Sequence, residues 1–141
     1  MTLNNFQFNT TPGLRFGSGE AKNSCKEIFN KLGSRILFIT DKGLMSLGLT
    51  KPTIQELKTM GEVEVFDEVE ADPSKKTLLT AIEIGKKFKA TGVIGFGGGS
   101  SMDVAKLTAL ILGSNEDLEK AWGVANAKGP RLPLVLIPTT A

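Results

Sequence analysis

Residues 91–112 read TGVIGFGGGSSMDVAKLTALIL, and this stretch decides the fold. Residues 93–96 form a short apolar run with β-branched side chains, which is typical of a buried parallel strand. Gly97, Gly98 and Gly99 follow at once, and Ser100 or Ser101 can then cap a helix. The apolar face expected for that helix consists of Val104, Ala105, Leu107, Thr108, Leu110 and Ile111. The stretch therefore predicts a strand, a glycine turn and a helix in direct succession.

A glycine turn between a strand and a helix has the properties of an anion site. Glycine lets a phosphate approach the backbone without a Cβ in the way, and the helix start offers N–H groups and a positive dipole end. We therefore expect a phosphate or pyrophosphate to bind over residues 97–101. The alternative is a plain connection, because glycine-rich turns also join strands to helices without binding a ligand. Neither GxGxxG nor GxxxxGK[ST] occurs, so the common nucleotide-binding fingerprints do not decide between the two.

The rest of the chain repeats the alternation of strand and helix. Three further strands are expected over residues 35–40, 62–66 and 134–137. Helices are expected over residues 20–32 (with Ser18 as the cap), 43–47, 53–60, 73–90 and 115–122. The alternation predicts an α/β fold, in which a Rossmann-like parallel sheet is flanked by helices on both faces. Residues 5–10 and 14–16 are expected to form an N-terminal β-hairpin, and residues 1–141 to form one domain.

Polar residues follow three of the predicted strands where each ends. They are Asp41, the glycine turn, and Thr139 with Thr140. In parallel α/β sheets a ligand binds outside the carboxyl ends of the strands, so these residues are expected to converge. A carboxylate at Asp41 can accept both hydroxyls of an adenosine ribose and would repel a 2′-phosphate, which favours NAD over NADP. The alternatives are a loop or cap residue at Asp41 and a simple strand-end turn at the two threonines.

Asp103 has two interpretations on the helix that follows the glycine turn. It lies three residues before Lys106, and this spacing is typical of a surface ion pair worth a few tenths of a kcal/mol. The other interpretation places the Asp103 carboxylate toward the helix dipole or the ligand. The sequence alone favours the surface pair.

The composition excludes several classes of function. Histidine and tyrosine are absent and cysteine occurs once, which rules out a His or Cys metal site and a His base within these residues. Cys25 is expected to be a small buried side chain. A net charge of +2 gives no reason to expect nucleic acid, and no apolar run is long enough for a membrane span. The lack of a signal peptide and of disulfides favours the cytoplasm.

Three motifs of the chain resemble the iron-containing (group III) alcohol dehydrogenases. GFGGGSSMDVAK at residues 95–106 is similar to the nucleotide-binding GGGSxxDxAK motif of that family. ITDKGL at residues 39–44 resembles the segment where an aspartate contacts the adenosine ribose. PLVLIPTTA at residues 133–141 is similar to the start of the PTTAGTGSE motif. The glycine motif alone is also similar to glycerol dehydrogenases and dehydroquinate synthases.

The resemblance implies an N-terminal NAD(P)-binding domain of a longer enzyme, whose C-terminal helical domain carries an Asp and three His ligands for iron or zinc. It implies that Asp41 contacts the ribose, and that Thr139 and Thr140 lie near the diphosphate and nicotinamide. The glycine turn would hold the pyrophosphate through Gly98, Gly99 and Ser100, and Asp103 matches a motif position of uncertain role. The cofactor residues implied are Asp41, Gly97, Gly98, Gly99, Ser100, Ser101, Asp103, Thr139 and Thr140.

The activity implied is hydride transfer between an alcohol or aldehyde and NAD, in an enzyme that forms a homodimer. No catalytic residue and no metal ligand is assigned within residues 1–141, and these residues alone are expected to lack dehydrogenase activity. Two alternatives stay open: a nucleotide-binding module without chemistry, and another member of the superfamily such as a glycerol dehydrogenase or a maleylacetate reductase.

Overall fold

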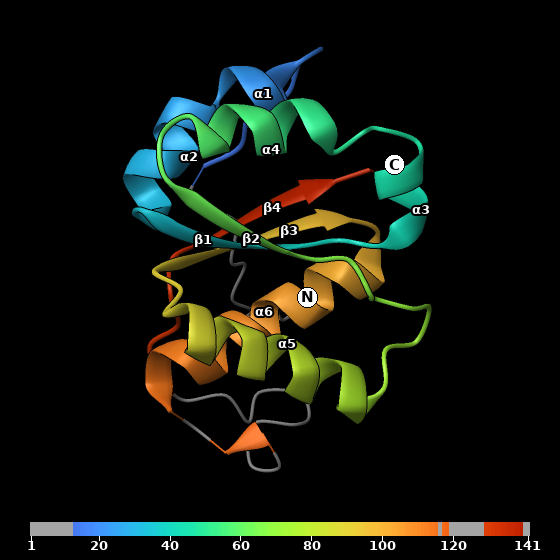
Figure 1. Cartoon of the computed structure of the whole chain (residues 1–141), viewed down its shortest axis with the longest axis vertical. Coiled ribbons are helices and arrows are strands. Elements are labelled where there is room, and N and C mark those ends of the chain that lie inside the picture. The colour runs from blue at the N-terminus through green and yellow to red at the C-terminus, as the bar shows by residue number, and fades with distance from the viewer. Residues whose placement is uncertain (1–12, 116, 119–128, 140–141) are drawn as a thin grey trace, which may run out of the picture.

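A computed structural model of the chain describes residues 13–115, 117–118 and 129–139. Its centre is a sheet of four parallel strands, shown in Figure 1. The strands are β1 (Arg35–Ile39), β2 (Glu62–Phe66), β3 (Gly92–Gly97) and β4 (Leu134–Pro138). Their spatial order is β2-β1-β3-β4. The predicted α/β fold with a Rossmann-like parallel sheet is therefore confirmed.

Helices cover both faces of this sheet. The first face packs against α1 (Glu20–Asn23), α2 (Cys25–Leu32) and α4 (Lys51–Lys58), and the second against α5 (Lys75–Phe88) and α6 (Gly99–Ser114) (Figure 1). The short helix α3 (Lys42–Ser46) follows β1 directly, and so it lies beyond the carboxyl end of that strand. The order of the strands also has a consequence for ligands. The chain goes from β1 to β2 on one side and then to β3 on the other, which puts the topological switch point between β1 and β3.

The two inner strands form the centre of the core. Every residue of β3 is buried, as are the last four of β1. Ile36 and Phe38 pack toward α2 and α4, whereas Leu37 and Ile39 pack toward α5 and α6. This alternation puts one apolar cluster on each face of the sheet. The switch point thus lies at the ends of two strands that are buried on both faces.

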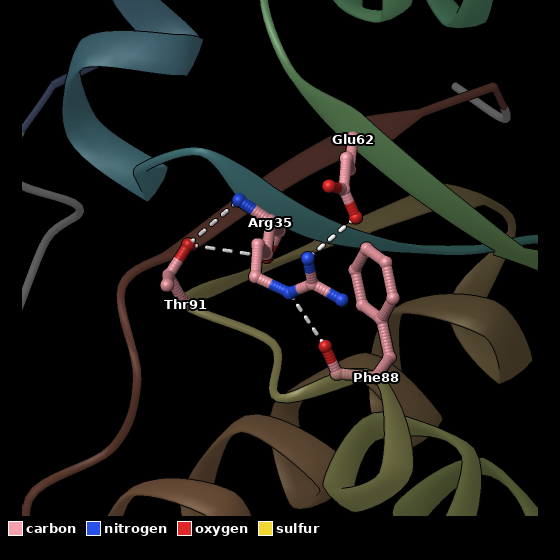
Figure 2. A network of polar contacts seen from close by, with 4 residues as sticks. All are labelled: Arg35, Glu62, Phe88 and Thr91. Carbon is pink, nitrogen blue, oxygen red and sulfur yellow. Dashed lines mark hydrogen bonds and ion pairs between the residues drawn. The ribbon is translucent and has the colours of Figure 1, made fainter.

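A polar network holds the opposite, amino-terminal edge of the sheet (Figure 2). The Nε of Arg35 donates to the carbonyl oxygen of Phe88 at 2.7 Å, and its guanidinium lies 4.4 Å from the centre of the Phe88 ring. The same guanidinium pairs with Glu62 at the start of β2. The hydroxyl of Thr91 accepts from the backbone N–H of Arg35 and donates to the carbonyl of Leu32 at 2.8 Å. The network ties the starts of β1 and β2 to the end of α5, away from the switch point.

The N-terminal part of the chain differs from the prediction. Residues 14–16 are not a strand, and the side chains of Leu14 and Phe16 are 87% and 99% exposed. An alternating pattern makes a strand only when a partner strand pairs with it, and the described residues provide none here. The other predicted arm of the hairpin, residues 5–10, lies outside the described residues.

Two predicted helices also have different limits. The helix predicted over residues 20–32 is two helices that meet at Ser24, and Gly19 rather than Ser18 is the cap residue of the first. Gly19 has a φ of +76°, a backbone conformation that glycine adopts without strain. Asn115, the predicted start of the helix over residues 115–122, instead ends α6 in the left-handed conformation. Residues 116 and 119–122 of that prediction lie outside the described part.

Candidate functional site

The turn between β3 and α6 depends on Gly97. Its φ is +147°, and a Cβ added there would lie 3.0 Å from the Oγ of Ser101 and 3.1 Å from the Cδ1 of Leu44. Both the backbone conformation and the lack of space therefore require glycine. Leu44 belongs to α3, so the turn after β3 directly contacts the helix that follows β1.

The start of α6 is open to an anion. Gly98 is the N-cap residue, and among the described residues no side chain caps the helix by a hydrogen bond. The first backbone hydrogen bond of the helix is donated by the N–H of Met102 to the carbonyl oxygen of Gly98 at 3.1 Å. The N–H groups of residues 99–101 belong to the first turn, which has no intrahelical acceptors for them. A Cβ added at Gly99 would meet no atom of the described part of the chain within 4 Å, which leaves room for a ligand beside this first turn.

The predicted caps of α6 were wrong. Ser100 and Ser101 lie inside the first turn of the helix rather than before it. Ser101 is 2% exposed, and its side chain contacts the position where Gly97 would carry a Cβ. Because Gly98 supplies the extended conformation of an N-cap, the helix begins at Gly99, two residues earlier than a cap at Ser100 would allow. The loss of a capping side chain is what leaves the N–H groups free.

Asp41 is the N-cap residue of α3. Its Oδ1 accepts from the backbone N–H of Leu44 at 2.8 Å, so the interpretation of Asp41 as a cap residue is correct. This bond uses one of the two carboxylate oxygens and fixes the side chain at the carboxyl end of β1. A backbone bridge between Asp41 and Glu68 continues the edge of the sheet beyond β2. The cap and the ligand interpretations are compatible, because a carboxylate has acceptor capacity for both.

Thr139 lies beside the glycine turn. Its backbone N–H donates to the carbonyl of Gly97 at 3.0 Å, which extends the pairing of β3 with β4 by one step. Gly97 is therefore the point where the ends of three strands meet, through Leu44 after β1 and Thr139 after β4. Thr140 lies outside the described residues. The convergence that the sequence predicts is present for Asp41, the glycine turn and Thr139.

Asp103 is placed as a surface residue. Its side chain is 70% exposed, and its Oδ1 lies 3.7 Å from the Nζ of Lys106 on the same helix. This is the surface pair that the spacing favours. It is worth at most a few tenths of a kcal/mol, because water and salt screen exposed charges.

Two residues near the turn were missed. A Cβ at Gly95 would lie 2.7 Å from the Cβ of Ala105 and 3.3 Å from the Cα of Met102, so this glycine lets α6 pack directly on β3. A glycine inside an apolar strand was the available signal. Thr40 is fully buried at the end of β1, and within the described ranges its hydroxyl has no hydrogen-bond partner. A polar residue ending the run RILFIT was its only signal.

The described residues offer no metal centre. No group of three or more His, Cys, Asp or Glu residues among them could hold a metal ion. The one cysteine, Cys25, is buried as predicted, and burial raises the pKa of its thiol to about 11. No helix within the described ranges has the length and apolar character that crossing a membrane requires.

Comparison with known protein families shows which family the chain belongs to. The family model for iron-containing alcohol dehydrogenases matches residues 12–141. The chain belongs to this family. The glycine turn, the Asp41 segment and the strand before Thr139 thus lie in the motifs on which the resemblance was based.

Over the aligned residues, curated relatives are about one third identical to the chain. A sulfoacetaldehyde reductase of Bilophila wadsworthia is 34% identical over 134 residues, which are 94% of this chain and 34% of that protein. A choline dehydrogenase of Bacillus subtilis is 36% identical over 132 residues, which are 91% of this chain and 33% of that protein. The chain spans about a third of the length of the curated relatives it matches.

Solved structures of the family have the same fold in this region. A sulfoacetaldehyde reductase of Bifidobacterium kashiwanohense in complex with NAD+ matches with a TM-score of 0.74 and 30% identity, over 89% of this chain and 34% of that one. The NADH-dependent butanol dehydrogenase A of Thermotoga maritima matches with a TM-score of 0.84 and 28% identity, over 97% of this chain and 35% of that one.

Proposed function

We propose that this chain is the NAD-binding part of a metal-dependent alcohol dehydrogenase. The observation that carries the proposal is the uncapped start of α6, which lies at the switch point of the sheet beside Gly97. Anions bind at such helix starts because the N–H groups point toward them and the dipole favours negative charge. Two members of the family support NAD as the ligand whose pyrophosphate binds here. One was solved with NAD+, and the other is described as NADH-dependent.

The residues around the turn have distinct roles in this proposal. Gly98, Gly99 and Ser100 hold the pyrophosphate through backbone N–H groups, and the free space at Gly99 admits it. The Asp41 carboxylate accepts the hydroxyls of the adenosine ribose, which favours NAD over NADP. Thr139 lies next to Gly97, where its hydroxyl is available to the diphosphate or the nicotinamide side. Thr140 has the same proposed role.

The chemistry divides between this chain and the rest of the enzyme. Bound nicotinamide accepts or gives the hydride, and the residues described here bind and orient it. Iron or zinc does not fit this chain: the sequence has no histidine, and the described residues contain no group that could hold a metal. We assign the catalytic metal to residues outside this region, which corresponds to about a third of the length of the relatives.

The substrate is an alcohol or aldehyde in this proposal, and its identity is left open. The relatives are described as acting on sulfoacetaldehyde, choline and methanol, so similarity to them does not single out one substrate. A homodimer and a cytoplasmic location also stay predictions. The alternative of a nucleotide-binding module without chemistry shares the same site and differs only in activity.

Calorimetric titration of NAD and of NADP into the wild-type chain and into an Asp41→Ala variant tests the proposal. We expect NAD to bind, NADP to bind more weakly, and the variant to lose NAD affinity because the ribose loses its acceptor. Circular dichroism of the variant is the control, because Asp41 also caps α3. A wild-type chain that binds no NAD would contradict the proposal.

A further inference from the structure

The first positive side chain after Asp41 is paired with another residue. Lys42 is the first residue of α3, and its Nζ lies 3.3 Å from the Oδ1 of Asp67. The Lys42 side chain is 69% exposed, so it has room to move. A cation at the start of a helix is also on the unfavourable end of the dipole, which increases its preference for an acidic partner.

Asp67 is the more rigid member of this pair. It follows β2 directly, and its side chain is only 32% exposed. The backbone on both sides of it is fixed, because the N–H of Thr40 donates to the carbonyl of Phe66 at 2.9 Å and Glu68 bridges to Asp41. Asp67 therefore defines where the Lys42 ammonium lies, rather than the reverse.

This pair bears on the choice between the two nicotinamide cofactors. NADP differs from NAD by a 2′-phosphate on the ribose that the proposed function assigns to Asp41. Dinucleotide sites that accept this phosphate supply a positive side chain nearby, whereas a carboxylate repels it. Lys42 is adjacent to Asp41 in the chain and is long enough to act as such a cation. In the structure it is instead directed to Asp67.

We infer that Asp67 is a positioning residue for cofactor choice, which keeps the Lys42 ammonium away from the 2′ position of the bound ribose. The inference rests on the proposed function and adds a second determinant to it. Asp41 disfavours the 2′-phosphate by its own charge, and Asp67 withholds the cation that would compensate.

The test is a titration of NAD and NADP into the wild-type chain and into Asp67→Asn, Lys42→Met, the double variant and Asp67→Glu. We expect Asp67→Asn to raise NADP affinity relative to NAD by about three- to fivefold, because the gain cannot exceed the strength of the partly exposed Lys42–Asp67 pair that is released. The double variant should return to the wild-type ratio, and Asp67→Glu should retain it because the ion pair can re-form. Lys42→Met alone should leave the ratio within about twofold, since Lys42 is already engaged.

Each other result contradicts the inference. A gain in NADP affinity that persists in the double variant would show that the charge of Asp67 acts directly and that Lys42 has no part. An unchanged ratio in Asp67→Asn, with a melting temperature like that of the wild type, would show that Asp67 does not withhold the cation. If Asp67→Asn fails to fold, Lys42→Met decides, because a large fall in NADP affinity would mean that Lys42 already contacts the phosphate. A failure of the proposed function is seen separately, as a wild-type chain that binds no NAD.

Discussion

Replacing Gly95 by alanine should destabilise the chain through the contact between β3 and α6. The added Cβ would lie 2.7 Å from the Cβ of Ala105, 3.0 Å from the Cδ2 of Leu136 and 3.3 Å from the Cα of Met102. Carbon atoms pack at about 3.5–4.0 Å, so α6 would have to move away from the strand by about 1 Å. Ala105 is completely buried, and no rotamer change can relieve a contact with its Cβ.

The magnitude follows from two opposing effects. Overpacking of a core costs about 1–3 kcal/mol, and the lower entropy of the unfolded alanine variant offsets about 0.4–1 kcal/mol of this. The expected net loss is about 1–2 kcal/mol, which for a chain of this size lowers the melting temperature by about 3–8 °C. Thermal unfolding followed by circular dichroism measures it. Gly99→Ala is the matched control, because the same methyl group enters free space there. Only the entropy effect remains, so this variant should be stabilised by about 0.4–1 kcal/mol. If the two variants are equally stable, the account of how α6 packs on β3 is wrong.

Four further outcomes are expected. Cys25 should resist alkylation at pH 8 until the chain is denatured, because burial raises the pKa of its thiol to about 11; rapid labelling of the native chain would contradict this. Thr91→Val should lower the free energy of unfolding by about 0.5–1.5 kcal/mol, measured by urea denaturation, because the carbonyl of Leu32 loses its hydroxyl donor. Hydrogen bonds from the Thr77 hydroxyl and the Ser74 N–H lower the pKa of Glu70. The ionised Glu70 therefore stabilises the folded chain above the unfolded pKa of about 4.3, and this stabilisation is lost as the pH falls below that value. Glu70→Gln should therefore flatten the fall of the melting temperature at acidic pH. The purified 141-residue chain should form no NADH from NAD and any simple alcohol, and turnover would refute the division of the active site between this region and the rest of the enzyme.

The strands could be predicted because their sequences have little ambiguity. The runs RILFI and GVIGFG are apolar and short, as expected for strands covered on both faces, and they form β1 and β3. The strand predicted over residues 14–16 failed because three alternating residues do not reveal whether a partner exists. The split of the first helix at Ser24 was equally invisible, because residues 20–32 contain no glycine or proline that would mark a break.

The candidate site was predicted in its position but not in its details. The carboxyl ends of parallel strands converge by topology alone, which is why Asp41, the glycine turn and Thr139 were found together. The identity of the cap was not predictable, because Gly98 replaces a serine cap through its backbone and not through a side chain. A glycine inside an apolar strand signals a close approach, but the sequence does not say that α6 is the element that approaches Gly95.

The most direct test of the central claim is an NMR titration of the 15N-labelled chain with NAD, read at the backbone amides of the first turn of α6. The account predicts that the amide signals of Gly99, Ser100 and Ser101 shift as NAD is added and saturate together, because their N–H groups take the pyrophosphate as acceptor. Amides of the network around Arg35, at the opposite edge of the sheet, should not shift. Saturating NAD that leaves the first turn of α6 unchanged would contradict the claim that this helix start is the cofactor site.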